Sequence, residues 1–356
     1  MTDQTQALQE QITAAYANKT ACRIEGGNSK HFIGNPSAGE QVSTKNHTGI
    51  ISYDASELVL TARSGTTLKE ISAALAVNNQ SLPFEPPAFS EHATIGGTIA
   101  CNLSGPARAY SGAARDFVLG TRIINGKGEV LQFGGQVMKN VAGYDASRLM
   151  AGAYGTLGLL LEVSLKILPK AQTEITIKSQ QSADAAINII NQLAGKYLPI
   201  SASCYFDEHL YIRLNSSQQN CEAASQMICQ QITAQPIESS AELWQQILEQ
   251  QHVFFDTDQP VARISLPATS QHIAITGEQL IEWGGALRWL KTDQPIEQLR
   301  QTVQALGGHV SAYKNYPADT EYFQPLASGI SILHKGLKNA FDPAGILNPG
   351  RLYKEL

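Results

Sequence analysis

The chain has 356 residues, 43% of them hydrophobic and 16% charged, which suits a folded protein of about two domains. Its net charge of −5 leaves no basic surface for nucleic acid or an anionic membrane. Residues 1–20 are polar and lack the basic start and apolar core of a signal peptide, so a cytoplasmic protein is expected. The most apolar stretch, residues 149–163, is interrupted by glycines and is too short to cross a bilayer, so direct membrane insertion is not expected.

The cysteines and histidines are dispersed along the chain. Five cysteines is an odd number, and none of them forms a C-x-x-C pair, which favours reduced thiols over disulfides or an iron–sulfur cluster. No two of the eight histidines lie within one helical turn of each other, and the H-E-x-x-H pattern is absent. The sequence therefore predicts no metal site.

The first half of the chain alternates short strand and helix patterns with glycine-rich segments. Thr66 or Thr67 caps a helix in which Glu70 favours the helix dipole. Three prolines within residues 82–87 remove hydrogen-bond donors and fix φ, so this segment is a rigid loop. The other predicted elements are a helix over 3–17, strands over 21–24, 49–53 and 57–62, a helix over 68–78, a hairpin of 117–125 with 129–133, and a strand over 159–168.

Three glycine-rich segments lie in this half, at residues 26–30, 94–104 and 152–158. In the first, Gly26 and Gly27 follow a predicted strand. Adjacent glycines let the backbone approach a ligand closely, and exposed N–H groups in such a turn bind anions. A simple turn would explain any one of these segments, whereas a single long anionic ligand explains all three together.

A pyrophosphate is an anion that such a set of loops suits. Each charge-assisted hydrogen bond contributes about 1.5–3 kcal/mol, whereas a helix dipole contributes about 0.3–1 kcal/mol at an exposed site. Several backbone N–H groups should therefore outweigh either a helix dipole or the single charge of Lys30. The glycines of segment 152–158 follow no predicted strand and lack the G-x-G-x-x-G spacing, which argues against a Rossmann dinucleotide site.

After Pro169 the composition changes, because glutamine becomes frequent and the glycine clusters end. Strands and helices alternate in a βαββα pattern, which predicts an α+β sandwich as a second domain. The chain closes with a rigid segment, Asp342-Pro-Ala-Gly-Ile-Leu-Asn-Pro-Gly350. We expect a first domain over residues 1–170, a second over 171–336, and a tail over 337–356 that returns toward the first domain.

Several motifs together resemble a known superfamily. They are Glu25-Gly-Gly-Asn-Ser-Lys30, Ala93-Thr-Ile-Gly-Gly97, Lys139-Asn-Val-Ala-Gly-Tyr-Asp145 and the segment 152–158. The set is similar to the FAD-binding domain of the vanillyl-alcohol oxidase and p-cresol methylhydroxylase (PCMH) superfamily, and residues 342–350 match its usual ending. Within it, the pattern looks most like the FAD-binding E subunits of bacterial glycolate oxidase. The resemblance implies an α+β fold, with a two-subdomain PCMH-type FAD-binding domain followed by a smaller, βαββα-like cap domain.

The resemblance also implies a cofactor site. Residues 26–30 would bind the FAD pyrophosphate, residues 88–94 and 101–104 would line the diphosphate and flavin, and residues 152–158 would hold the adenosine side. Some relatives attach flavin covalently through a histidine where this chain has Asn28, so non-covalent FAD is expected. The implied FAD-binding residues are Gly26, Gly27, Asn28, Ser29, Lys30, Pro87, Glu91, Thr94, Ile95, Gly96, Gly97, Cys101, Asn102, Ser104, Gly152, Gly155, Thr156, Leu157 and Gly158.

No catalytic residue can be assigned. Related 2-hydroxy-acid dehydrogenases carry an H-x-G-D-G-N-x-H-type stretch in their second half, and this chain has none. Arg263, Arg288 and Lys314 could bind a substrate carboxylate, but they are better explained as solvated or paired surface charges. The chain therefore looks able to hold flavin yet poorly equipped to oxidise a hydroxy acid alone.

Three functions stay open. The first is an FAD-binding subunit of a glycolate oxidase complex, working beside a larger catalytic flavin subunit and an iron–sulfur subunit as electron relay or support while the complex oxidises glycolate to glyoxylate. The second is a self-sufficient FAD-dependent dehydrogenase for a small 2-hydroxy acid. The third is a cofactor-free scaffold, against which the intact glycines argue. Any attachment to the inner face of the cytoplasmic membrane would come through partners.

Overall fold

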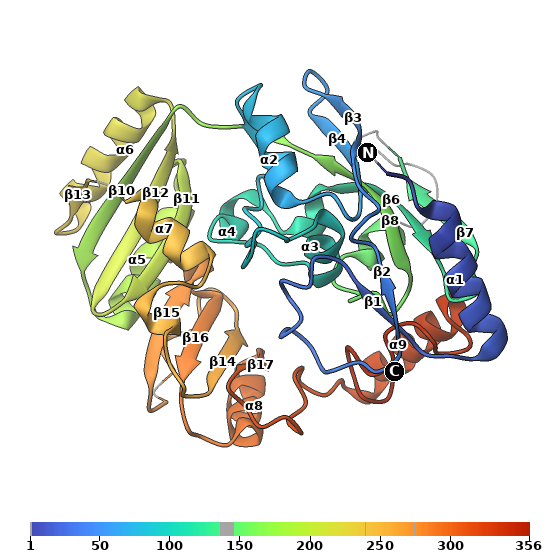
Figure 1. Ribbon diagram of the computed structural model, residues 1–356. Helices are drawn as coiled ribbons and strands as arrows, with labels where there is room; N and C mark the ends of the chain where they lie inside the picture. The colour runs from blue at the N-terminus through green and yellow to red at the C-terminus, as the bar shows by residue number, and fades with distance from the viewer. Residues whose placement is uncertain (1, 136–145, 239, 274) are drawn as a thin grey trace. The chain divides into compact units, whose positions relative to one another are not determined.

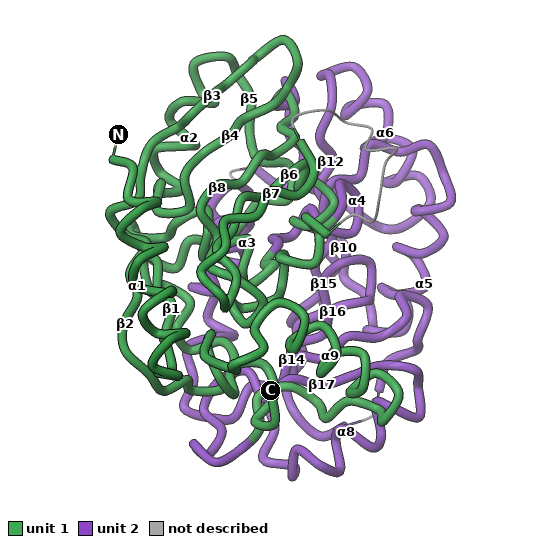
Figure 2. Tube along the Cα trace, turned by 90° about the vertical axis from the view of Figure 1, so that its right-hand side faces the viewer, with its two compact units in different colours: residues 1–103, 113–169, 321–356 green, residues 104–112, 170–320 purple. Residues whose placement is uncertain are grey.

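The structure, a computed structural model, describes residues 2–135, 146–238, 240–273 and 275–356 (Figure 1). The motif over 139–145 lies outside the described residues. The chain divides into two compact units, coloured separately in Figure 2. Unit 1 contains residues 1–103, 113–169 and 321–356, and unit 2 contains residues 104–112 and 170–320. Unit 2 thus ends before residue 336, and the domain division expected from the sequence stays a prediction.

Unit 1 is built on an antiparallel sheet of order β3-β4-β8-β6-β7. A separate parallel pair, β1 with β2, precedes it in the chain. The elements of unit 1 are α1 Thr5–Asn18, β1 Cys22–Glu25, β2 Glu40–Ser43, β3 Ile50–Asp54, β4 Val59–Arg63, α2 Leu68–Ala76, β5 Gln80–Ser81, α3 Ile95–Cys101, η1 Ala114–Phe117, β6 Val118–Ile124, β7 Val130–Gly134, η2 Ala146–Met150, β8 Leu159–Lys166, β9 Leu168–Pro169 and α9 Ser328–Phe341.

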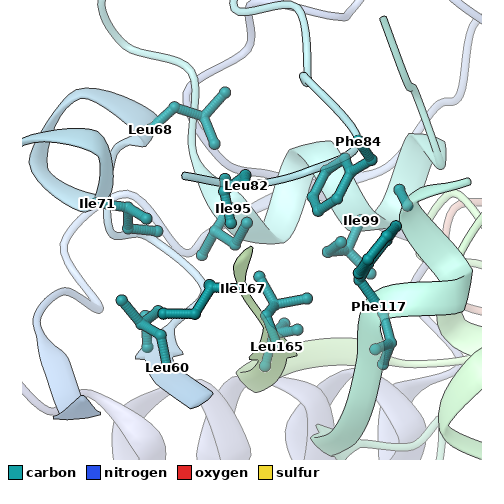
Figure 3. Packing of buried hydrophobic residues seen from close by; sticks show 14 of the residues in the cluster. Leu60, Leu68, Ile71, Leu82, Phe84, Ile95, Ile99, Phe117, Leu165 and Ile167 are labelled. Carbon is teal, nitrogen blue, oxygen red and sulfur yellow. The ribbon is translucent and has the colours of Figure 1, made fainter. Parts of the chain in front are cut away.

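Helices α2 and α3 cover one face of this sheet. Thr67 begins α2 with a capping box, because its Oγ1 accepts the Glu70 N–H at 3.1 Å while the Glu70 carboxylate accepts the Thr67 N–H at 2.8 Å. In Figure 3, Ile95 and Ile99 of α3 lie above Leu165 of β8 in one apolar cluster. Burial of each such side chain contributes about 1.5–3 kcal/mol, so this core holds α3 against the sheet.

The opposite face of β8 carries a second core. Leu159 and Leu161 pack there in one cluster with Leu8 of α1 and with Ile346 and Leu347 of the C-terminal tail. Helix α1 and the C-terminal tail, which lie at opposite ends of the sequence, thus pack against the same strand. This packing places the tail beside β1, where Cys22 and Leu347 form a parallel bridge.

Unit 2 contains one sheet of order β13-β10-β12-β11-β15-β16-β14-β17. Its two halves share one topology, since each orders its strands fourth, first, third, second, as ferredoxin-like βαββαβ units do. The halves meet at β11 and β15. The expected α+β cap fold is confirmed, with the βαββα pattern as the first half. The elements are α4 Arg108–Ser111, β10 Thr173–Gln180, α5 Ala183–Ala194, β11 Ile200–Phe206, β12 His209–Ser216, α6 Gln218–Gln231, β13 Gln235–Ile237, α7 Ala241–Leu248, η3 Val253–Phe255, β14 Val261–Ser265, β15 Glu278–Glu282, η4 Trp283–Gly285, β16 Leu287–Lys291, α8 Ile296–Ala305 and β17 His309–Lys314.

Candidate functional site

The loop after β1 contains the first glycine pair of the sequence. A Cβ on Gly26 would lie 2.7 Å from Oγ1 of Thr94. A Cβ on Gly27 would lie 1.5 Å from the carbonyl oxygen of His92, which is closer than any side chain can approach backbone. Both positions therefore require glycine, because the segment that leads into α3 packs directly against this loop.

The backbone of this loop presents hydrogen-bond donors. Asn28 has a φ of 58°, in the left-handed region. Within the described part of the chain, no group accepts a hydrogen bond from the N–H groups of Gly27, Asn28 or Ser29. Successive amide groups around a left-handed residue form a concave anion-binding surface. The loop is therefore suited to a negatively charged group.

Lys30 adds a positive charge to the same loop. The residue is only 6% exposed, and its Nζ lies 3.3 Å from Oγ of Ser29 and 3.4 Å from the carbonyl oxygen of Ala88. Nζ also lies 5.6 Å from the centre of the Phe89 ring. Burying an ammonium group costs free energy that an opposite charge offsets, so an anion bound beside it would be stabilised.

Helix α3 forms a second side of the site. Thr94 caps the helix, and its Oγ1 accepts the N–H of Gly97 at 3.3 Å. A Cβ on Gly96 would lie 2.5 Å from Cβ of Ser64, so this glycine serves packing. A Cβ on Gly97 would meet Oγ1 of Thr94 at 3.4 Å, an ordinary contact. Gly97 therefore has room for a methyl group within the protein and lines the cavity beside the helix.

The third side joins two segments far apart in the sequence. The side chain of Asn348, in the C-terminal tail, donates from Nδ2 to the carbonyl oxygen of Tyr154 at 2.7 Å. Its Oδ1 accepts the N–H of Ile24, in β1, at 2.7 Å. Arg351 follows and donates to two carbonyl groups of the loop between β1 and β2. The tail thus forms part of the site together with β1 and the third glycine segment.

These sides surround a cavity of about 500 Å³ within unit 1, in the range of about 300–1,000 Å³ typical of small-molecule and cofactor sites. Burial raises the pKa of the Cys101 thiol, with Lys30 and Arg351 opposing the rise. The thiol is therefore protonated at neutral pH. The lining residues are Arg23, Ile24, Glu25, Gly26, Gly27, Asn28, Ser29, Lys30, His31, Phe32, Gly34, Pro36, Ser37, Thr94, Gly97, Ala100, Cys101, Tyr154, Asn348 and Arg351.

The cavity contains part of the cofactor set predicted from the sequence. Ile95 is instead fully buried in the core, and a Cβ on Gly158 would lie 2.7 Å from Cδ1 of Ile123. Ser104 belongs to unit 2. The assignment of the predicted residues to FAD stays a prediction. Those that line the cavity are Gly26, Gly27, Asn28, Ser29, Lys30, Thr94, Gly97 and Cys101, and those that do not are Pro87, Glu91, Ile95, Gly96, Asn102, Ser104, Gly152, Gly155, Thr156, Leu157 and Gly158.

Sequence reasoning missed the contribution of the tail. The available signal was the segment 342–350, a rigid stretch attached to no predicted helix or strand. Asn348 has a φ of 42°, which asparagine tolerates better than most residues. Tyr154 lies in the predicted segment 152–158 but was not among the residues named individually. The other lining residues not named in the prediction are Arg23, Ile24, Glu25, His31, Phe32, Gly34, Pro36, Ser37, Ala100, Asn348 and Arg351.

The residues present fit FAD. The first loop offers amide donors and the charge of Lys30 to a pyrophosphate, and Gly97 leaves space beside α3. Among the residues the structure describes, no three His, Cys, Asp or Glu side chains are placed to hold a metal ion. None of the described helices is both long and apolar enough to cross a bilayer.

Two arginines of unit 2 that were considered for binding a substrate carboxylate make contacts within the unit. Arg288 is fully buried and donates hydrogen bonds to the carbonyl groups of Ser270, Gln271 and Gly285. The expectation of a surface charge is therefore wrong for Arg288, because the guanidinium group anchors a loop inside the unit. Arg263 is half-buried, with its guanidinium carbon 5.3 Å from the Trp283 ring centre.

Comparisons with known proteins show the family of the chain. The family described as FAD binding domain matches residues 2–134. The chain is 46% identical to glycolate oxidase subunit GlcE of Escherichia coli (strain K12) over 99% of each chain. It is 34% identical to glycolate oxidase subunit GlcD of Bacillus subtilis (strain 168), over 44% of this chain and 33% of that protein. A D-lactate dehydrogenase of Archaeoglobus fulgidus is 31% identical over 42% of this chain and 34% of its own.

A solved structure of alkyldihydroxyacetonephosphate synthase shares the fold, with a TM-score of 0.69 over 96% of this chain and 74% of that one, at 15% identity. That similarity shows the architecture alone. The identity to GlcE extends over nearly the full length of both chains. The names GlcE and GlcD indicate that these relatives are subunits of one kind of oxidase. The chain belongs to the GlcE family of FAD-binding glycolate oxidase subunits.

Proposed function

We propose that the chain is the FAD-binding subunit of a glycolate oxidase complex. The observation that carries the proposal is the 46% identity to GlcE over 99% of each chain. A cavity lined by the glycine loop and α3 supports it. FAD supplies the redox chemistry when it is bound. The chain would relay electrons within the complex or support the flavin of a partner.

In this proposal the chain's own residues hold the cofactor without a covalent bond. The N–H groups of Gly27, Asn28 and Ser29 bind the pyrophosphate, and Lys30 balances its charge. Asn28 stands where some relatives have the histidine that links flavin covalently. Precipitation with acid should therefore release all of the flavin into the supernatant, and flavin retained by the precipitated chain would refute the non-covalent assignment.

We further propose that the partners are a larger catalytic flavin subunit, related to GlcD, and an iron–sulfur subunit. The first is supported by the 34% identity to GlcD over 44% of this chain. The complex would act in the cytoplasm or at the inner face of the cytoplasmic membrane. Copurification from the native host, with flavin and iron counted per complex, tests this composition.

A self-sufficient 2-hydroxy-acid dehydrogenase is the second candidate. The 31% identity to two D-lactate dehydrogenases, over 39% and 42% of this chain, favours it. The absence of the H-x-G-D-G-N-x-H-type stretch from the sequence opposes it. The purified chain, loaded with FAD, should be assayed with glycolate and an artificial electron acceptor. We expect no substantial turnover until the catalytic flavin subunit is added. Robust turnover by the chain alone would refute the relay or support role.

A further inference from the structure

The C-terminal tail is fastened to unit 1 by a buried ion pair. Lys338, in the last turns of α9, is 8% exposed and Asp342 is 1% exposed. Nζ of Lys338 donates to Oδ2 of Asp342 at 2.8 Å, to the carbonyl oxygen of Leu347 at 2.7 Å and to that of Thr156 at 2.9 Å. One ammonium group therefore connects α9, the tail and the third glycine segment, with each of its three protons engaged.

The position of Asn348 follows from this anchor. Its N–H donates to the carbonyl oxygen of Cys22 at 2.9 Å, and the Cys22 N–H donates to Ile346 at 2.7 Å, so the tail pairs with β1. The side chain then bridges Ile24 and Tyr154. Segment 152–158 thus gives two carbonyl groups, those of Tyr154 and Thr156, to residues of α9 and the tail.

Arg351 extends the contact to the first loop. Its guanidinium group donates to the carbonyl oxygens of Asn35 at 2.7 Å and His31 at 3.0 Å. In return, the Asn35 side chain donates to the carbonyl of Gly350 at 3.1 Å. The tail therefore contacts the loop that carries the amide donors, as well as β1.

We propose that the C-terminal tail completes the FAD site, with Asn348 as the positioning residue that holds β1 and the segment around Tyr154 at the spacing the cofactor requires. The inference rests on the proposed FAD-binding function and extends it beyond residues 2–134, which match the FAD-binding domain family. Tyr154, Asn348 and Arg351 all line the cavity, although they lie outside that range.

Two substitutions of Asn348 isolate the role of its side chain. Asn348→Gly tolerates the positive φ at this position but removes both hydrogen bonds. Asn348→Asp keeps an acceptor for Ile24 and places a second carboxylate oxygen against the carbonyl oxygen of Tyr154, so it should be worse than glycine. The matched control is Lys335→Ala, which removes the exposed 2.7 Å contact of α9 with Glu355 in the tail, away from the cavity.

The test is titration of the full chain with FAD, followed by visible circular dichroism and by the rate of flavin release. We expect Asn348→Gly to raise the Kd about tenfold, to speed release and to change the flavin spectrum, with Asn348→Asp more affected and Lys335→Ala like wild type. Unfolding of the FAD-free proteins is measured in parallel, and the titration is made where all remain folded.

Three outcomes would overturn the inference. An unchanged Kd and spectrum for Asn348→Gly would show that the tail is not part of the site. A lower unfolding midpoint of the FAD-free variant with normal affinity would assign Asn348 a role in stability alone. Failure of the wild-type chain to bind FAD would overturn the proposed function as well, which distinguishes the two failures.

Discussion

The two glycines at the start of α3 should respond to alanine in opposite ways. On Gly97, the new Cβ would meet Oγ1 of Thr94 at 3.4 Å, an ordinary contact, and alanine in a helix is favoured over glycine by about 1 kcal/mol. On Gly96, the Cβ would lie 2.5 Å from Cβ of Ser64 and 2.8 Å from its carbonyl oxygen. Overpacking of this kind costs about 3 kcal/mol at the upper end of its usual range, so Gly96→Ala should lose about 2 kcal/mol of unfolding free energy.

The effect of Gly97→Ala on FAD affinity should differ from its effect on stability. The methyl group of Gly97→Ala would enter the cavity and overlap bound FAD at a cost of about 2 kcal/mol, which corresponds to about a thirtyfold higher Kd. The measurements are urea denaturation of the FAD-free proteins and fluorescence titration with FAD. A Gly97→Ala protein with lower FAD-free stability, or with unchanged FAD affinity, would refute the assignment of Gly97 to the cavity.

Three further predictions concern the rest of unit 1 and the stability of the whole chain. Gly155→Val should abolish FAD retention, because a Cβ there would lie 2.7 Å from Nδ2 of Asn348 at a φ of +73°; flavin absorbance after gel filtration checks this, and normal retention would contradict it. Lys338→Met should lower the unfolding free energy by about 3–5 kcal/mol by leaving the Asp342 carboxylate buried without its cation; a loss below about 1 kcal/mol in urea denaturation would show that the pair is dispensable. Burial lowers the pKa of His47 and His252 from 6.5, so the unfolded chain binds more protons than the folded chain below about pH 6.5. The unfolding free energy should therefore fall as the pH is lowered from 7 to 5, by up to about 1.4 kcal/mol per pH unit for each histidine. In urea denaturation at a series of pH values, His47→Gln should reduce this slope, and an unchanged slope would contradict the role given to His47.

The sequence predicts the local features of the site better than its long-range assembly. Gly26 and Gly27 could be identified from the sequence because backbone segments that approach each other closely require glycine. The capping of α2 by Thr67 follows from local rules. The role of Gly96 differs from that of Gly97 only through Ser64, which lies in a different segment of unit 1. Such a distinction depends on tertiary packing and leaves no trace in the spacing of residues.

The tail illustrates the same limit. The sequence predicts a rigid segment at residues 342–350, but the partners of Asn348 lie more than 190 positions away, in Tyr154 and Ile24. Hydrogen bonds of this sequence separation follow from the fold of the sheet and not from local propensity. Likewise, Arg288 gives the same signal in the sequence whether its partners are water or buried carbonyl groups.

The flavin content of the purified chain tests the central claim most directly. The full chain is incubated with FAD, separated from free cofactor by gel filtration, and its absorbance near about 450 nm, characteristic of an oxidised flavin, is compared with protein concentration before and after acid precipitation. The account predicts one FAD per chain, all of it released by acid. A chain that carries no flavin after incubation with FAD would contradict it.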